Sequence, residues 1–299
     1  MQKENPIAKE RGRFSLLRLL TFGANADPNA PHTVIFRHGL FLRLTHWLNA
    51  AILVFMLMSG LQIFNAHPAL YFGAQSDFAH PALSMTGITN ANGELRGITQ
   101  IGRWQLDTTG LFGASNVDGT RVARGFPSWA TIPGTQWLAL GRRYHFFFAW
   151  FFVANGLMFA LWGILSGHFR KDLIPTAHDV TALPREIADH ARLKFAHDAR
   201  ARHYNALQKL TYFIVLFVIA PLIVATGLTM SPTLDSAFPF LPWLFGGRQT
   251  ARTIHFIAAF SLLAFFVVHL VMVVLSGTLN NLRSMITGRY AIEGDDDHG

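Results

Sequence analysis

The chain has 299 residues, of which 51% are hydrophobic and only 14% are Asp, Glu, Lys or Arg. Soluble domains carry about a quarter charged residues, so this composition argues against a water-soluble protein. The absence of cysteine excludes disulfide bonds, iron–sulfur clusters, thiolate zinc sites and covalently attached haem. The net charge of +8 does not indicate a nucleic-acid partner, because the basic residues flank apolar runs, as they do in membrane proteins.

The first 40 residues are predicted to form a cytoplasmic N-terminal segment. Its stretch RGRFSLLRLLTF, residues 11–22, is basic and amphipathic, which is typical of a segment that lies on the inner leaflet and contacts lipid. We expect no cleavable signal peptide here, because no apolar core with a small-residue cleavage site follows this stretch.

Residues 41–290 are predicted to form an all-α membrane domain, a bundle of four transmembrane helices. A helix needs about 20 residues to cross a bilayer core, and in hydrocarbon its backbone groups must bond within the segment, which favours helices over strands. Four such runs in one small chain disfavour the alternative of buried helices in a soluble protein. The runs lie at residues 44–66, 144–167, 210–231 and 253–277.

The distribution of Lys and Arg predicts that both termini lie in the cytoplasm. Of the 25 Lys and Arg residues, 17 fall in residues 1–43, in residues 168–209 and after residue 278. Cytoplasmic segments carry an excess of these residues. We therefore expect a multi-pass protein of the bacterial inner (cytoplasmic) membrane.

The segments between the spans differ in character. Residues 67–140 form a predicted periplasmic insertion that is too long for a simple connector, so we expect a docking surface or a cap, with a plain lid as the alternative. The cytoplasmic loop 168–209 contains PREIADHARLKF, which is typical of a surface helix that begins near Pro184. The tail 291–299 is acidic and is expected to be solvated rather than to bind a cation.

Histidines are the candidate cofactor ligands, because an ionisable residue inside a membrane span is costly. His255 and His269 are 14 residues apart on the fourth helix, which places them on one face about 21 Å apart along its axis. One metal ion could not bind both, but two stacked flat cofactors could. By depth, His145 pairs with His255 near the outer side, and His46 pairs with His269 near the inner side. Two bis-histidine sites are the arrangement expected for two b-type haems, with these four side chains binding iron.

Glycines on the first two helices are candidates for contact with a haem face. Gly60 follows His46 by 14 residues and Gly156 follows His145 by 11, so each helix would carry a histidine at one haem level and a glycine at the other. A glycine lets a porphyrin approach the backbone, and close helix packing is the alternative interpretation. The segment MSGLQI at the end of the first span is faintly echoed by ATGLTM at the end of the third.

Polar groups at the membrane edges supply further candidates. The segment HYNALQK before the third span could bind a quinone, which needs hydrogen-bond donors at its carbonyls and a route for protons to water. Asn205 and Gln208 share a helix face, and His203 is the candidate proton donor. Ordinary helix caps and a solvated loop histidine are the alternatives, while His168 is expected to be an interfacial residue. Arginines near the histidines could pair with haem propionates: Arg43, Arg142, Arg143 and Arg252.

Several segments resemble a known family. FRHGLFLRLTHWLNAAILVFMLMSGLQI resembles the opening of the prokaryotic cytochrome b561 and nickel-hydrogenase cytochrome b family, which includes the membrane subunits of formate dehydrogenase and thiosulfate reductase. In this resemblance RLTHWLNA implies His46 as a ligand, and RRYHFFFAWFFVANGL implies His145. TIHFIAAFSLLAFFVVH implies His255 and His269. HYNALQK resembles the quinone-site segment of the formate dehydrogenase membrane subunit, and LNNLRSMITGRY and ATGLTMSP resemble members associated with periplasmic molybdopterin oxidoreductases.

The sequence thus predicts a dihaem cytochrome b that transfers electrons across the inner membrane between the quinone pool and a periplasmic redox partner. The resemblance implies a molybdenum cofactor-containing oxidoreductase as that partner. In this role the chain is an electron-transfer subunit with no catalytic residues of its own, and haem b and quinone are its cofactor and substrate. The alternatives are the membrane anchor of a hydrogenase or formate dehydrogenase, and a non-redox scaffold or transporter whose histidines serve packing or proton relay.

Overall fold

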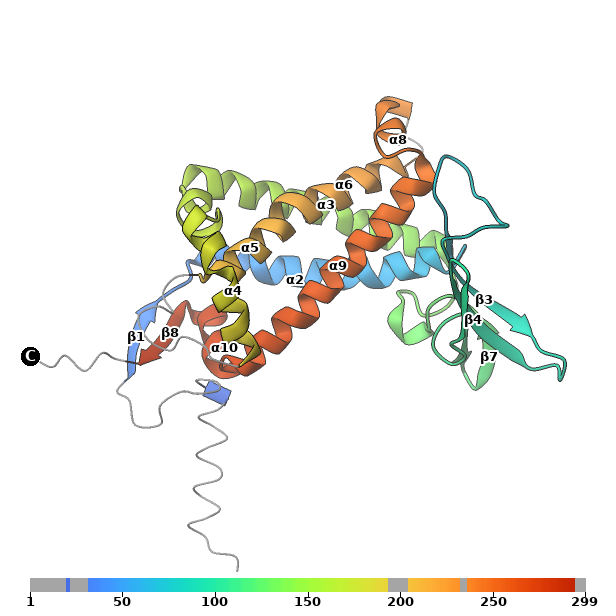
Figure 1. The fold of residues 1–299 in the computed structure, drawn as a ribbon, viewed down its shortest axis with the longest axis horizontal. Helices are drawn as coiled ribbons and strands as arrows, with labels where there is room; N and C mark the ends of the chain where they lie inside the picture. The colour runs from blue at the N-terminus through green and yellow to red at the C-terminus, as the bar shows by residue number, and fades with distance from the viewer. Residues whose placement is uncertain (1–19, 22–31, 193–203, 232–235, 294–299) are drawn as a thin grey trace, which may run out of the picture. The chain divides into compact units, whose positions relative to one another are not determined.

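The computed structural model describes residues 20–21, 32–192, 204–231 and 236–293 (Figure 1). Nearly all of the basic stretch 11–22, the candidate His203 and the end of the acidic tail therefore lie outside the described residues. The chain divides into two compact units, which are described separately. One comprises residues 1–46, 159–218 and 262–299, and the other comprises residues 47–158 and 219–261.

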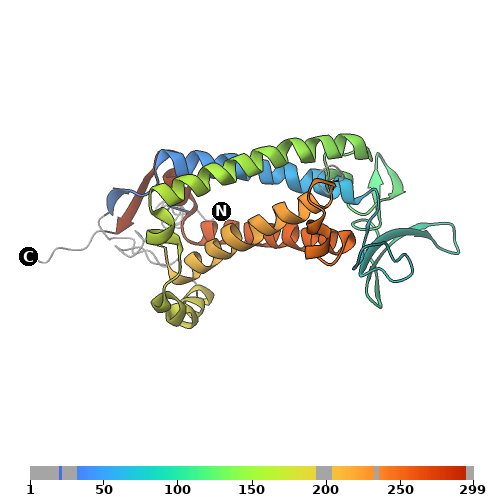
Figure 2. The same cartoon turned by 90° about the horizontal axis from the view of Figure 1, so that it is seen from above.

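Four helices are long and apolar enough to cross a membrane, which agrees with the four predicted spans (Figures 1 and 2). Each begins four to six residues earlier than predicted and ends two residues earlier. An apolar run measures the hydrocarbon thickness, whereas helical hydrogen bonding continues through polar flanks such as Arg43 and Arg142. The helices are α2 (Leu40–Phe64), α3 (Leu138–Leu165), the span Ala206–Thr229, and α9 (Arg248–Leu275).

The third span is not a regular helix. It consists of α5 (Ala206–Ile214), a π-helical turn at Val215–Ile219, and α6 (Ala220–Thr229). Pro221 has no backbone N–H and cannot donate to the carbonyl four residues earlier, so regular α-helical bonding fails at this point. The π-helical turn lies immediately before this proline and takes up the irregularity.

Large apolar side chains on the spans face outward, as contact with lipid requires. Trp150, Leu161 and Ile164 on α3 are each at least 60% exposed in the isolated chain. Outward-facing side chains of this size would be unfavourable in water over a whole helix. They support a multi-pass membrane protein.

The unit that contains both ends of the described chain has a small sheet and two surface helices. Strand β1 (His32–Phe36) pairs antiparallel with β8 (Arg289–Glu293), next to α10 (Thr278–Thr287). The buried Asn280 on α10 donates to the carbonyl of Ala291 and accepts from its N–H, with distances of 2.8 and 2.9 Å. This sheet fixes the backbone that leads into α2.

The predicted loop helix is present, but it begins earlier than expected. Helix α4 spans Ala177–Ala191, so Pro184 lies inside it rather than at its start. Thr176 caps the helix, because its side chain accepts from the Asp179 N–H while the Asp179 carboxylate accepts from the Thr176 N–H. The same carboxylate binds Lys209 on α5 at 3.1 Å, which ties the loop to the third span.

The insertion between the first two spans is built from strands, so the expectation of an all-α chain is too narrow. Its strands β2 to β5 form one antiparallel sheet in sequence order, and β6 and β7 form a separate hairpin. The strands are β2 (Ala69–Leu70), β3 (Leu83–Thr89), β4 (Leu95–Ile101), β5 (Trp104–Asp107), β6 (Ala114–Val117) and β7 (Thr120–Ala123). Thr and Ile are frequent in them, and such residues favour strands.

The insertion is anchored to the span ends within its own unit. Thr253 on α9 donates to the carbonyl of Tyr71 at 2.6 Å, and the guanidinium of Arg252 donates to the carbonyl of His67 at 2.5 Å. Phe64, Leu70, Met85 and Phe126 form a buried apolar cluster at the junction. A short helix, α8 (Phe240–Leu244), lies between the third and fourth spans of this unit.

Candidate haem-binding site

Two helices of the second unit bring His145 and His255 together. His145 lies on α3 and His255 on α9, and their ring centres are 6.3 Å apart with the planes inclined at 66°. The two residues are 110 positions apart in the chain, so only the packing of the helices creates this pair. We call it the His145–His255 pair.

Hydrogen bonds fix both rings of this pair in the same tautomer. The Nδ1 of His145 lies 3.2 Å from the carbonyl of Met56 and 3.1 Å from the hydroxyl of Ser59. The Nδ1 of His255 lies 3.0 Å from the carbonyl of Ile223 and 3.1 Å from the hydroxyl of Thr226. A carbonyl only accepts, so each Nδ1 carries the proton. Each Nε2 therefore keeps its lone pair for a metal.

The two hydroxyls are oriented to accept rather than to donate. Ser59 donates its own proton to the carbonyl of Phe55 at 2.6 Å, and Thr226 donates to the carbonyl of Leu222 at 2.7 Å. Both side chains are fully buried. The hydroxyl oxygen is then left to receive the Nδ1–H of the neighbouring imidazole.

A glycine follows each hydroxyl residue and lies against the same imidazole. A Cβ on Gly60 would lie 3.3 Å from Cε1 of His145, and a Cβ on Gly227 would lie 3.4 Å from Cε1 of His255. These distances leave little room for a larger side chain. Glycine thus permits the close approach between each ring and the neighbouring helix backbone.

These contacts give a structural reason for the echo between MSGLQI and ATGLTM. Ser59-Gly60-Leu61 and Thr226-Gly227-Leu228 occupy equivalent places beside two different histidines. Sequence reasoning singled out Gly60 alone from these two segments. The repeated hydroxyl–glycine–leucine pattern is the signal that would have identified Ser59, Thr226 and Gly227.

The other unit holds the second predicted pair. His46 on α2 and His269 on α9 have ring centres 6.3 Å apart and planes inclined at 58°. The ring of Phe265, one turn earlier on α9, stacks on His269 with 5.9 Å between centres. The structure therefore places together the two residues that were paired from sequence by depth.

Both ring separations fit two imidazoles that bind one metal from opposite sides. A metal–imidazole bond of about 2.0 to 2.1 Å on each side, and about 1.1 Å from nitrogen to ring centre, give centres about 6.3 Å apart. Both measured separations are 6.3 Å. Within the described ranges no cluster of three or more His, Asp or Glu side chains could hold a bare metal ion. The two facing imidazoles of each pair fit an iron whose remaining ligands come from a porphyrin.

The remaining candidates for haem contact are one glycine and four arginines, and their surroundings differ. A Cβ on Gly156 would meet nothing within 4 Å, so this position faces open space. Arg43 donates to the carbonyl of Ile286, and Arg252 binds the carbonyl of His67 as described above. Arg142 and Arg143 are exposed, and the guanidinium of Arg142 lies 5.6 Å from the ring centre of Phe146.

The amide candidates for a quinone site are used in a helix cap. The side chain of Asn205 accepts from the Gln208 N–H at 2.8 Å, and the side chain of Gln208 accepts from the Asn205 N–H at 3.2 Å. The Asn205 amide also lies 3.4 Å from Nε2 of His190. His168 belongs to neither pair, since its Nδ1 lies 2.7 Å from the carboxylate of Asp172.

Comparison with known proteins gives the family. The sequence profile of the family described as prokaryotic cytochrome b561 matches residues 37–288. The chain is 29% identical over 240 residues to YedZ1 of Azospira oryzae, whose name is that of a protein-methionine-sulfoxide reductase subunit. That match covers 80% of this chain and 90% of the relative. No solved structure matches the chain. The family profile spans most of the chain, including all four spans and both histidine pairs, and the chain is a member of the prokaryotic cytochrome b561 family.

Proposed function

We propose that this protein is a dihaem cytochrome b that carries electrons between the quinone pool and a periplasmic molybdopterin oxidoreductase. Family membership makes it a membrane electron-transfer protein of the haem b type. The number of haems, the quinone and the molybdenum partner are parts of the proposal. No catalytic residue is assigned, because the substrate reaction of the complex would occur on the partner.

The observation that carries the proposal is the duplication of one geometry. Two separate imidazole pairs each have ring centres 6.3 Å apart, as a metal between two histidines requires. In the His145–His255 pair both Nδ1 atoms are hydrogen-bonded, which leaves both Nε2 atoms for iron. A scaffold or transporter would not need two matched pairs of this kind.

When bound, haem b supplies one-electron exchange between its ferric and ferrous states. The chain contributes four imidazole ligands, hydrogen bonds that hold the rings, and an apolar helical surround that excludes water. A quinol carries two electrons, which a haem can accept only one at a time. Two haem sites, each with a ligand on α9, would provide a route for these electrons across the membrane. His46 and His269 would hold the haem nearer the cytoplasm, and His145 and His255 the haem nearer the periplasm.

The relative's name supports both an oxidoreductase as the partner and the direction of electron flow. YedZ1 of Azospira oryzae is named as a subunit of a reductase, and a reductase consumes electrons. By analogy we assign quinol as the electron donor and the periplasmic partner as the acceptor. The insertion at residues 67–140 would lie on the partner's side of the membrane.

The test is the haem content and reactivity of the purified protein. We expect two haem b per polypeptide in a pyridine haemochrome assay, and full reduction of both by a short-chain quinol. One haem per chain would overturn the dihaem assignment. Two haems that dithionite reduces but a quinol does not would remove the quinone from the proposal and leave the electron-transfer role.

A finer prediction concerns the hydroxyls of Ser59 and Thr226. A histidine ligand that donates through its second nitrogen becomes more basic and favours ferric iron. Ser59→Ala and Thr226→Val each remove one acceptor, whereas the backbone carbonyls remain. A hydrogen bond contributes about 0.5 to 1.5 kcal/mol, so we expect the midpoint potential of this haem to rise by roughly 20 to 60 mV.

Thr229→Val is the matched control for this measurement. Thr229 is also fully buried on α6, but its hydroxyl donates to the carbonyl of Ala225 and, among the residues that the structure describes, bonds no histidine. Potentiometric titration of the haem absorbance should show no shift for this variant. Equal shifts in all three variants would mean that the effect comes from helix packing and not from the imidazole hydrogen bonds.

A further inference from the structure

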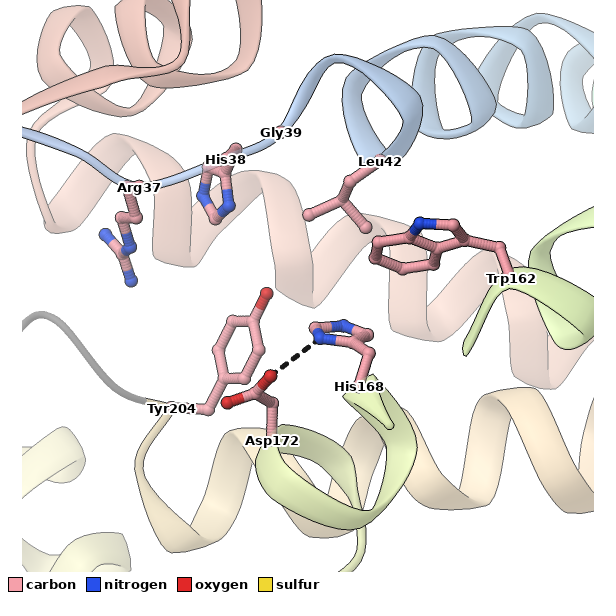
Figure 3. A pocket seen from close by; sticks show the side chains of 8 residues that line it. All are labelled: Arg37, His38, Gly39, Leu42, Trp162, His168, Asp172 and Tyr204. Carbon is pink, nitrogen blue, oxygen red and sulfur yellow. Dashed lines mark hydrogen bonds and ion pairs between the residues drawn. The ribbon is translucent and has the colours of Figure 1, made fainter. Parts of the chain in front are cut away.

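A pocket that the function above does not use lies at the start of α2, within the unit that contains His46 and His269 (Figure 3). Its walls come from the segment Arg37–Leu42, from Trp162 near the end of α3, from the turn that carries His168 and Asp172, and from Tyr204 before α5. From sequence, His168 is expected to be an interfacial residue and Tyr204 lies in the candidate segment HYNALQK, whereas the other lining residues have no predicted role.

The pocket has the size of one six-membered ring. Its volume is about 170 Å³, and a cavity of about 150 Å³ in another protein is known to bind benzene. Leu42 and Trp162 provide an apolar side, and the indole of Trp162 lies 5.0 Å from the imidazole of His168 between ring centres. A flat ring with apolar substituents fits these surroundings.

An acid–base pair forms the opposite side. The Nδ1 of His168 donates to the carboxylate of Asp172 at 2.7 Å, which leaves Nε2 of His168 for a ligand. The His168 side chain is 14% exposed and that of Asp172 is 39% exposed. The imidazole is thus shielded while the carboxylate reaches water, which is the arrangement needed to pass a proton outward.

Two further polar groups are neutral. Burial, followed by the charge of Arg37, lowers the pKa of His38 to about 4, and burial raises the pKa of the Tyr204 phenol. Figure 3 shows the Tyr204 hydroxyl pointing toward the space between the two imidazoles. These side chains can hydrogen-bond a carbonyl or hydroxyl without carrying a charge.

The pocket is next to a proposed haem ligand. Leu42 and His46 are four residues apart on α2, so they lie on the same face, one turn apart. His38, which also lines the pocket, lies two residues before the start of α2. A ring bound in this pocket would therefore lie about one helical turn from the imidazole of His46.

We propose that this pocket binds the ring of a quinol, with the His168–Asp172 pair as the proton acceptor. The proposal rests on the function proposed above and names the place where the quinol reacts. Oxidation of one quinol breaks its two O–H bonds and yields a quinone, two protons and two electrons. The haem that His46 and His269 would hold supplies the one-electron acceptor for the two electrons, and each proton passes to Nε2 of His168 and leaves toward water beside Asp172.

The charges argue for a neutral ring over a phosphate group. Asp172 would repel an anion, and the Arg37 guanidinium lies over the ring of Tyr290, 4.5 Å from its centre. The placement also differs from the amide pair of Asn205 and Gln208, whose polar atoms serve the cap of α5. Tyr204, the residue before that cap, is the one that lines the pocket.

The test uses two variants of the full-length haem-loaded protein. Gly39 lines the pocket and a Cβ there meets nothing within 4 Å, so Gly39→Leu adds a side chain at the pocket wall without moving the backbone. His168→Gln keeps hydrogen-bonding atoms but removes the base. His178→Gln is the control, because His178 is exposed on α4 and does not line the pocket.

Binding of a radiolabelled short-chain quinone and haem reduction by the matching quinol are both measured. We expect Gly39→Leu to weaken binding by about tenfold or more, because the added side chain competes with the ring for the space in the pocket. We expect His168→Gln to bind the quinone but to slow quinol oxidation by about 10²-fold, as the loss of a general base does. Haem spectra and the control should match the wild type.

The possible outcomes distinguish a failure of the pocket assignment from a failure of the proposed function. If wild-type protein neither binds the quinone nor accepts electrons from the quinol, the quinone role itself fails and the pocket assignment fails with it. If both variants bind and react like the wild type, the function stands and the pocket is overturned. A loss seen only in Asn205→Leu would likewise overturn it and assign the quinone to the amide pair.

Discussion

Replacing either His145 or His255 by alanine is expected to lower the haem content from two per chain to one, with loss of the same haem in both variants. The two imidazoles face each other at the separation that one iron requires. Loss of one ligand leaves a single imidazole and a cavity, and the affinity for haem then falls steeply. A pyridine haemochrome assay gives the stoichiometry, and the reduced spectrum identifies the haem that is missing.

His67→Ala is the control for these variants. His67 belongs to the same unit but bonds the hydroxyl of Tyr71 at 3.0 Å rather than another histidine. It should retain both haems. Added imidazole should partly restore haem to His145→Ala, because it can occupy the space left by the ring. Spectrally different losses in the two alanine variants would contradict the pairing.

Alanine in place of His46 or His269 is expected to abolish reduction of the remaining haem by quinol. These two residues form the other pair, and the proposed quinol pocket begins one turn from His46. Without this haem the electrons from quinol have no nearby acceptor, so the rate should fall by orders of magnitude. Dithionite, which is small and soluble, should still reduce the remaining haem.

Stopped-flow absorbance with both reductants distinguishes this result from misfolding. A misfolded variant would lose both haems, whereas the expected variant keeps one that dithionite reduces at the wild-type rate. His178→Ala, on the same unit and exposed, should behave as wild type. Quinol reduction at an unchanged rate in His46→Ala would place the quinone beside the other haem.

Much of the membrane architecture could be predicted because it depends on local composition. The four spans follow from long charge-free runs, and the 14-residue spacing of His255 and His269 follows from helix periodicity. The partners of these residues could be ordered by depth, since consecutive spans are predicted to cross the membrane in opposite directions. The structure brings together the same four histidines in the same two pairs.

The features that escaped prediction depend on contacts between distant segments or on short strands. The pocket combines Arg37, Trp162, His168 and Tyr204, which no local pattern links. The strands of the insertion are four to seven residues long, apart from the two-residue β2, and a run of this length has little periodicity of its own. The start of α4 was misplaced because Pro184 resembled a first-turn proline, while the reciprocal cap at Thr176 lies eight residues earlier.

The pairing of β1 with β8 has a consequence for the order of assembly. Arg37 and His38, which line the pocket, directly follow β1, and β1 is held by residues 289–293. During synthesis β1 cannot pair with β8 until all four spans have been made, because β8 follows the last span in the chain. The strand that is made last, β8, thus fixes the segment that leads into the first span. Nascent chains would complete their helices before this wall of the proposed quinol pocket is fixed, so an unfinished chain is expected to be unable to accept electrons from quinol.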